Sequence, residues 1–475
     1  MKVLKVTESI VSADLIRAAE NCSKLPGYCC LNTPDARYFF LEPLQLIVAG
    51  ANSCNIIANS GSEQINIDPI TVIDKYLNPI LTSTSNVKLL PCAAGYFAYE
   101  LADFLPAVPW SDTKSLSCPV IHFAIYSKIL KYKPGTAVAR LYTVRYVKDL
   151  KPLWLFRDVT ATDYYRSYPS NSDFNINNLY CQAKADLDSC ALPDAGTYKT
   201  RIKKIIELIA DGQVYQINLT RRYELPCELE PYNFYLIMEQ MAAAEYRGYL
   251  NCTSMDGNPF SIVSASPERF FSLRNNALIS SPIKGSAPRS SSPEQDHLLR
   301  ESLLSSEKDR AELAMIVDLI RNDLGRIAVT GSVRVNGHAL LKKLPHIYHL
   351  YSDVSCRLPE SVTLTDIINA LFPCGSITGA PKIAAMQYIR ELECCPREVY
   401  TGAIGCIGPG NFADFNVAIR TGIIKNQKLS FNTGGGIVFD SKPELEHQES
   451  ITKALDIFAA WLTSAANQLE SHVAF

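Results

Sequence analysis

The chain has 475 residues, of which 47% are hydrophobic and 20% charged, and its formal net charge is −2. This composition is typical of a globular protein with a large core, and the interspersed charges argue against a nucleic-acid partner, whose phosphates require a basic surface. No apolar run reaches the roughly 18 residues of a membrane span, so we expect no membrane partner and a cytoplasmic location.

The 15 cysteines include no CxxC pair. The two adjacent pairs, Cys29-Cys30 and Cys394-Cys395, are strained candidates for disulfides. An odd number of cysteines without a disulfide framework indicates reduced, mostly buried thiols, in agreement with a reducing compartment.

Three regions are expected along the chain. Residues 1–160 mix short β-like runs with Pro, Ser and Asn, which predicts a sheet-rich N-terminal region. Residues 161–193 are the most polar and turn-rich stretch and are predicted to connect this region to a catalytic domain at 194–465. That domain opens with a helix predicted to end near Gly212, and its helices and strands alternate irregularly rather than as βαβ units. The pattern favours an α+β fold.

The segment FSIVSASPERFFSLRNNALISSPIKGSAPR is predicted to form strands around an Asn275-Asn276 turn. Counting back from a two-residue loop places Glu268 nearly opposite Ile283, beside Lys284. Partial burial would lower the pKa of Lys284 and leave some neutral, nucleophilic amine. Glu268 is then a candidate general acid or base. A surface salt bridge accounts for the two residues equally well at this point.

Two acidic pairs are predicted to lie on helices. Asp309 and Glu312 stand one turn apart on the amphipathic stretch EKDRAELAMIVDLIRNDLG, and Glu446 and Glu449 repeat the spacing near the C-terminus. One such pair alone is usually a solvated helix face. Two pairs that converge would offer oxygen ligands to a hard divalent ion, for which Mg²⁺ is the expected choice.

Anion-binding groups follow in the last quarter of the chain. FNVAIRTGII reads as an alternating strand that carries Arg420, and KLSFNTGGGIVFDS reads as a strand ending in Gly434, Gly435 and Gly436. Successive glycine N–H groups can form an anion-binding nest, and arginine can grip a carboxylate in a bidentate manner. A flexible turn and a surface arginine are the simpler explanation. With a metal ion, however, these groups would describe a pocket for a small substrate with two carboxylates.

Between about Tyr198 and Leu462 the chain resembles the chorismate-binding family, which includes anthranilate synthase large chains, aminodeoxychorismate synthases, and isochorismate and salicylate synthases. The resemblance rests on blocks in one order: SPERF, PIKGSAPR, EKDRAELAMIVDLIRNDLGR, LPHIYHLYS, FPCGSITGAPK, REVYTGAIG, FNVAIRT and GGGIVFDSKPELEHQE. It implies largely antiparallel β-sheets that pack together and are surrounded by helices.

The resemblance also implies roles for individual residues. They are Glu312 and Glu449 as Mg²⁺ ligands, with Asp309 and Glu446 close by and acting through water; Arg420, Tyr400 and the backbone around Gly434 and Gly435 as groups that hold the substrate's carboxylates; His349 and Thr378 as further pocket residues; and Glu268 as the acid that helps the C4 hydroxyl of chorismate leave.

Lys284 discriminates between the family's reactions. Anthranilate synthases resemble this segment but read PIAGT, whereas aminodeoxychorismate synthases read PIKGT, and GQVYQINLTRRY is also closer to the latter group. The resemblance therefore implies amination of chorismate to 4-amino-4-deoxychorismate, for p-aminobenzoate and folate biosynthesis. Lys284 would attack C2 as the C4 hydroxyl departs, and ammonia would then add at C4 and expel the lysine.

Ammonia implies a partner, because the family obtains it from a glutaminase subunit or fused domain and this chain lacks a complete glutaminase triad. Three alternatives stay open. They are an anthranilate synthase, a pyridoxal-phosphate enzyme that uses Lys284 as its Schiff base, and a catalytically silent subunit. The two acidic pairs count against the pyridoxal-phosphate alternative, since they would have no role there.

Overall fold

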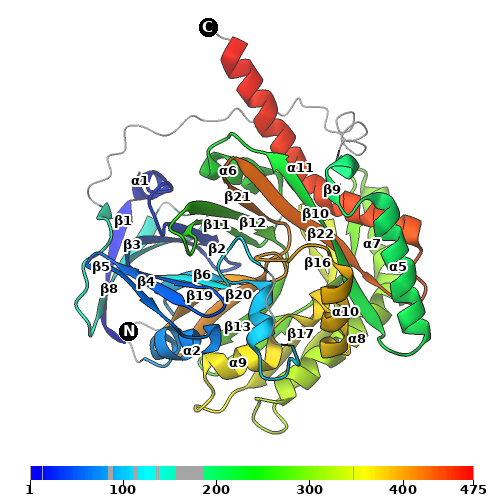
Figure 1. The fold of residues 1–475 in the computed structure, drawn as a ribbon, viewed down its shortest axis with the longest axis horizontal. Helices are drawn as coiled ribbons and strands as arrows, with labels where there is room; N and C mark the ends of the chain where they lie inside the picture. The colour runs from blue at the N-terminus through cyan, green and yellow to red at the C-terminus, as the bar shows by residue number, and fades with distance from the viewer. Residues whose placement is uncertain are drawn as a thin grey trace.

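The computed structural model describes residues 2–12, 14–83, 89–110, 115–134, 136, 138–156, 187–242, 244–345 and 347–473. They form helices around one connected network of strands, and every strand pair is antiparallel (Figure 1). Most of the predicted connection at 161–193 lies outside the described residues. The domain boundaries at 160 and 193 therefore stay predictions.

The N-terminal strands are organised by two long ones, β3 (Arg37–Ala49) and β7 (Ile121–Tyr132), which pair along their length. β3 reads RYFFLEPLQLIVA, and nearly all its side chains are buried, as expected of aromatic and β-branched residues in the middle of a sheet. Around them lie β1 (Val3–Ser12), β2 (Cys29–Asn32), β4 (Cys54–Ala58), β5 (Gly61–Ile65), β6 (Ala93–Phe97) and β8 (Val138–Tyr146).

Two pairings connect this N-terminal set to the rest of the chain. β2 pairs with β11 (Tyr246–Thr253), and β6 pairs with β19 (Ala403–Gly408). From β11 the network continues through β12 (Pro259–Ser266), β21 (Thr421–Lys425), β22 (Lys428–Ile437) and β10 (Gln216–Pro226), with short β9 (Ala191–Leu192) and β18 (Gly379–Ala380) at its end. From β19 it continues through β20 (Phe412–Val417), β13 (Arg269–Arg274), β14 (Ala277–Ser281), β17 (Ile347–Arg357), β15 (Ile283–Pro288) and β16 (Arg334–Lys343). The α+β prediction with largely antiparallel strands is confirmed.

Helices surround the strands (Figure 1). The longer ones are α5 (Ala195–Ala210), α6 (Pro231–Met241), α7 (Pro293–Ser305), α8 (Glu307–Gly325), α9 (Leu364–Leu371), α10 (Lys382–Leu392) and α11 (Pro443–Val473). The shorter ones are α1 (Asp14–Glu20), α2 (Pro69–Val72), η1 (Ile73–Leu77), α3 (Asn78–Leu81), η2 (Tyr99–Phe104) and η4 (Gly375–Ile377). None of the described helices is both long and apolar enough to span a membrane.

Two helices bring the acidic pairs to the sheet. The hydroxyl of Ser306 caps α8 by accepting the N–H of Asp309, and the predicted apolar side of the helix is buried against β15 and β17. α11 begins with Pro443 in its first turn, where proline is favoured, and packs on β22. Asp309 of α8 therefore lies beside Gly285 of β15, and Glu446 and Glu449 of α11 lie beside Gly435 of β22.

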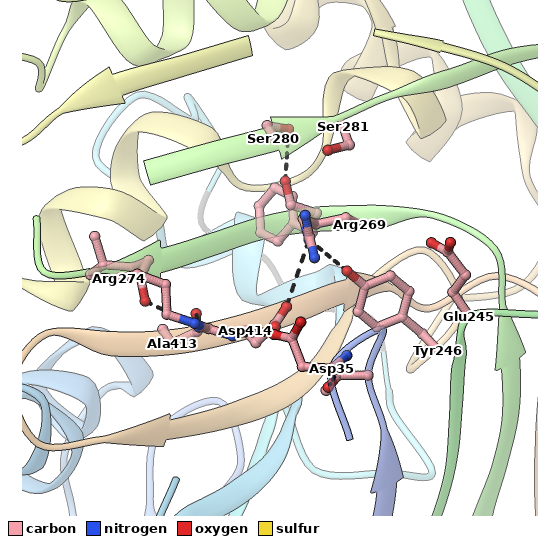
Figure 2. A network of polar contacts seen from close by, with 12 residues as sticks. Asp35, Glu245, Tyr246, Arg269, Arg274, Ser280, Ser281, Ala413 and Asp414 are labelled. Carbon is pink, nitrogen blue, oxygen red and sulfur yellow. Dashed lines mark hydrogen bonds and ion pairs between the residues drawn. The ribbon is translucent and has the colours of Figure 1, made fainter. Parts of the chain in front are cut away.

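A buried charge network secures the hairpin that carries the candidate catalytic residues (Figure 2). The predicted turn is confirmed: Asn275 and Asn276 have φ of 49° and 65° and join β13 to β14. From β20, Asp414 accepts a 2.8 Å hydrogen bond from Arg274, while Arg269 lies 3.9 Å away and donates to Tyr246. Burial raises the pKa of Asp414 despite the two arginines. The network ties β13 to β20 immediately after Glu268.

Candidate active site

Lys284 projects from β15 into a cluster of charged groups. Its Nζ lies 3.4 Å from the point where a Cβ on Gly436 would stand, so the amine is close to β22. Burial lowers its pKa below the usual 10.5, and Glu312, Glu268 and Glu449 oppose that shift. The lowered pKa agrees with the sequence prediction and increases the fraction of neutral, nucleophilic amine.

Glu268 follows β12 and is 4% exposed. Burial raises its pKa to about 7, although the Ser376 hydroxyl, the Lys284 charge and the Ile283 N–H favour the ionised form. The Ile283 contact places Glu268 across the hairpin from Lys284, as counted from the turn. Its Oε1 is buried and finds no hydrogen-bond partner among the described residues. A carboxyl group with a pKa near neutrality can donate and recover a proton.

The two acidic pairs converge from α8 and α11. Glu312 and Glu449 influence each other electrostatically, and both act on Lys284. Burial raises the pKa of Glu312 and Glu446. Burial also acts to raise the pKa of Glu449, but Lys453 and more distant lysines outweigh it, and the net shift is downward. Lys453 lies 2.7 Å from Glu449, and Lys308 lies 3.8 Å from Glu312.

Two glycines permit this close packing. Gly285 has φ of 82°, and a Cβ there would lie 2.8 Å from the Cβ of Asp309, so β15 can approach α8 only without a side chain. A Cβ on Gly435 would stand 3.2 Å from Glu446 Oε2 and 3.7 Å from Glu449 Oε1. Both carboxylates therefore pack directly against the backbone at Gly435.

The predicted glycine nest is wrong. Gly434, Gly435 and Gly436 lie inside β22 and pair with Thr220, Leu219 and Asn218 of β10, and none has the positive φ that a nest requires. Gly434 must lack a side chain for steric reasons, because a Cβ there would stand 2.0 Å from the Leu219 carbonyl oxygen.

The predicted continuous strand through Arg420 is also interrupted. β20 ends at Val417 and β21 begins at Thr421, and Arg420 between them has φ of 50°. Its Nε lies 3.2 Å from Asp456 Oδ2 of α11, and the side chain is 21% exposed. The Arg420 side chain therefore extends from a turn toward α11 rather than from one face of a continuous strand.

The remaining predicted pocket residues are buried in different ways. Burial, and to a smaller extent the positive charge of Arg420, lowers the pKa of His349 to about 3. Its Nδ1 is 2.6 Å from the Ser286 hydroxyl, while its Nε2 is buried with no partner in the described part of the chain. Tyr400 is 7% exposed. Thr378 is fully buried, and its hydroxyl donates to the Cys374 carbonyl, so its side chain points into the protein.

Two residues that we did not predict also belong to the cluster. Gln216 is fully buried with neither amide atom paired to a described residue, and its Nε2 stands 2.8 Å from the Cβ point of Gly436, beside Lys284. Lys453 bonds the Gly434 carbonyl at 2.9 Å as well as Glu449. The sequence signal for Lys453 is its i,i+4 spacing from Glu449, which by itself resembles an ordinary surface pair.

A buried ion pair supports the backbone behind the site. Arg397, 2% exposed, donates to Glu393 at 2.7 and 2.8 Å, and to the carbonyls of Asn218 at 2.6 Å and Ile377 at 2.9 Å. Glu393 also accepts the N–H and hydroxyl of Thr220. The pair thus joins β10 to the segment before Thr378.

Glu268→Gln is expected to stabilise the fold at alkaline pH. The raised pKa means that the folded protein keeps the Glu268 proton between about 4.5 and 7 while the unfolded chain loses it, so stability falls as pH rises through this window. At about 1.4 kcal/mol per unit, the cost is on the order of 3 kcal/mol above pH 7. Denaturant unfolding at pH 5 and pH 8 measures the difference. An equal effect at both pH values, or the same effect from exposed Glu360→Gln, would contradict this prediction.

Comparisons with known proteins identify the family of the chain. The family described as chorismate binding enzyme matches residues 28–459. The chain is 38% identical over 392 residues to aminodeoxychorismate synthase component 1 of Escherichia coli (strain K12), covering 81% of each chain. It is 36% identical over 405 residues to anthranilate synthase component 1 of Mycolicibacterium smegmatis, covering 84% of this chain and 77% of the relative. The crystal structure of anthranilate synthase component I from Streptococcus pneumoniae TIGR4 superposes with a TM-score of 0.67 at 26% identity, covering 91% of this chain and 93% of that one. This chain belongs to the family of chorismate-binding enzymes.

Proposed function

We propose that this chain aminates chorismate to 4-amino-4-deoxychorismate with ammonia from a glutaminase partner. The observation that carries the proposal is Lys284, an amine with a lowered pKa that shares its cluster with the buried carboxyl of Glu268. The similarity to aminodeoxychorismate synthase component 1 supports it.

The protonation states of this pair suit the reaction. Burial lowers the pKa of Lys284 and raises that of Glu268, so the neutral amine and the neutral acid become accessible together without a change in total charge. The neutral amine is the nucleophile, and the protonated carboxyl is the acid. Each group would be in the wrong state at neutral pH if it were exposed to water.

In the proposed sequence, Lys284 Nζ forms a bond to C2 as the ring double bonds shift and the C4 hydroxyl leaves with the proton of Glu268 as water. Ammonia then bonds to C4, the double bonds shift back, and the C2–N bond breaks to release Lys284. The Glu268 carboxylate recovers the proton that the added ammonia loses. The balance is chorismate plus ammonia to aminodeoxychorismate plus water.

The substrate's carboxylates require fixed donors near Lys284. We assign this role to Arg420, Tyr400 and the backbone at Gly434 and Gly435. His349 supports the assignment, because its low pKa keeps it neutral and its unpaired Nε2 can hydrogen-bond a ligand. Thr378 would shape the pocket through its backbone, since its hydroxyl is already bonded.

The acidic cluster fits Mg²⁺ in donor chemistry, because it offers carboxylate oxygens from two helices and Mg²⁺ takes few protein ligands together with several waters. The described residues contain no preformed group of three or more metal-ligating side chains. We propose Glu312 and Glu449 as direct ligands, with Asp309 and Glu446 reached through water. When bound, the ion would neutralise a carboxylate of the substrate.

Glu449→Gln is expected to raise the Mg²⁺ concentration for half-maximal chorismate consumption by about 10-fold or more, because it removes one of two charged ligands. Titration calorimetry with Mg²⁺ should show the same loss without any turnover. Glu444→Gln, which removes the same charge in the first turn of the same helix but outside the two acidic pairs, is the matched control. Equal Mg²⁺ dependence in both variants would remove Glu449 from the metal site.

A glutaminase partner is the expected source of ammonia. The names of the relatives, which call them component 1, imply a second component for those proteins. For this chain, free ammonium should replace the partner in the assay.

Product identification tests the proposal. The purified chain is incubated with chorismate, Mg²⁺ and excess ammonium at mildly alkaline pH, and the products are separated by chromatography and mass. Aminodeoxychorismate, converted to p-aminobenzoate by added lyase, is the expected result. Anthranilate would instead establish the second candidate, which the similarity to anthranilate synthase component 1 favours.

A further inference from the structure

Cys394 and Cys395 form a pair of thiols directly after α10. Their sulfur atoms lie 3.7 Å apart. Cys394 is exposed and Cys395 half-buried, whereas every other described cysteine except Cys190 is buried. Burial raises the pKa of those thiols, for example to about 12 at Cys92, and it also raises the pKa of half-buried Cys395, so access to solvent is what distinguishes the pair.

The spacing of the two sulfurs fits a shared soft ligand better than a disulfide. Two sulfurs bound to one soft centre at about 2.3 Å each stand about 3.3 Å apart at the roughly 90° angle of a pyramidal centre and about 3.8 Å apart at the tetrahedral angle. A disulfide requires sulfurs at about 2.05 Å and usually Cα atoms at about 4.4–6.8 Å, whereas adjacent Cα atoms are only about 3.8 Å apart. Chelation therefore needs little movement, and ring closure to a disulfide needs distortion.

The two cysteines also lie next to the buried ion pair between Glu393 and Arg397. They occupy two of the three positions between Glu393 and Arg397, whose ion pair supports the backbone of Asn218 and Ile377. Cys395, Glu393 and Arg397 line one cavity, together with Tyr99, Glu100 and Trp110. A group bound to Cys395 on this side would lie in the same cavity as the Glu393–Arg397 ion pair and could displace its side chains.

We propose that Cys394 and Cys395 form a dithiol site for a soft, thiophilic centre and that its occupation disturbs the active site through Glu393 and Arg397. Trivalent arsenic is the ligand class that needs only two protein sulfurs. With an aryl arsenoxide, two As–S bonds form and the oxygen leaves as water with both thiol protons. Arsenic stays trivalent, so no oxidant or reductant takes part.

Phenylarsine oxide is the binding probe. Intact-mass measurement of the full chain is expected to show one adduct, formed with one equivalent of reagent and lost in Cys394→Ser and in Cys395→Ser. Cys190→Ser, which removes the other exposed described thiol, should bind normally. An adduct that persists in both pair variants, or that disappears in Cys190→Ser, would overturn the site.

Chorismate consumption, measured without regard to the product, tests the coupling. The adduct should raise KM for chorismate several-fold while kcat changes less, because the ion pair supports the pocket wall rather than Lys284. Dimercaptopropanol should restore KM and a monothiol should not, and Cys394→Ser should resist the reagent while keeping its basal activity. Stoichiometric binding with unchanged KM would overturn the coupling. Because the product is not specified, a different amination product leaves this test intact.

Discussion

Lys284→Ala is expected to lower the formation of aminodeoxychorismate by about 10²-fold or more, because it removes the nucleophile that opens the route to C4. The fold should be unaffected or slightly stabilised, since the variant also removes a cation whose burial is unfavourable. Steady-state product analysis in excess ammonium measures the loss.

Two control variants separate the roles of Lys284. Lys284→Arg keeps a positive charge but cannot supply a neutral amine, because guanidinium stays protonated. It should be nearly as inactive as the alanine variant if nucleophilic attack is the role. Substantial activity in Lys284→Arg would show that charge alone is needed and would contradict the proposed covalent step. Exposed Lys204→Ala should be active.

Arg397→Met is expected to cost about 3–5 kcal/mol of folding free energy. It removes a guanidinium that is 2% exposed and the countercharge of buried Glu393. The Asn218 and Ile377 carbonyls each lose one hydrogen bond, although Asn218 Nδ2 still donates to Ile377. Denaturant unfolding measures the loss. Lys204→Met breaks the exposed pair with Glu207, 3.2 Å apart, and should cost about 0.5 kcal/mol or less.

The double variant Glu393→Leu with Arg397→Met tests whether the buried charge of Glu393 causes the loss of folding free energy in Arg397→Met. It should recover part of the stability, because both buried charges are then absent. If the double variant is as unstable as the sum of the single ones, the backbone contacts rather than the ion pair carry the effect.

Sequence reasoning succeeded where the determining contacts are local. The Asn275-Asn276 turn allowed Glu268 and Lys284 to be placed at one end of a hairpin, because a two-residue loop sets the register of both strands. The apolar spacing along residues 307–325 likewise predicted the buried side of α8 and hence the side on which its acids lie.

It failed where the contacts are distant in sequence. Gly434, Gly435 and Gly436 were interpreted as the end of a strand, forming either a nest or a flexible turn, but β10, more than 200 residues earlier, holds them inside a strand. Arg420 was expected within a strand, but packing against α11 favours a turn with positive φ. Neither partner can be identified from the local pattern.

The amino-acid sequence by itself determined the ordered blocks of the family, the fold class and the chemical identity of the candidate groups. These depend on residue type and short spacing, which the printed chain contains. Only the tertiary structure decided the raised pKa of Glu268 and the entry of Gln216 and Lys453 into the cluster, whereas the lowered pKa of Lys284 had been predicted from the sequence. The physical reason is that desolvation and charge interactions depend on which distant segments surround a side chain.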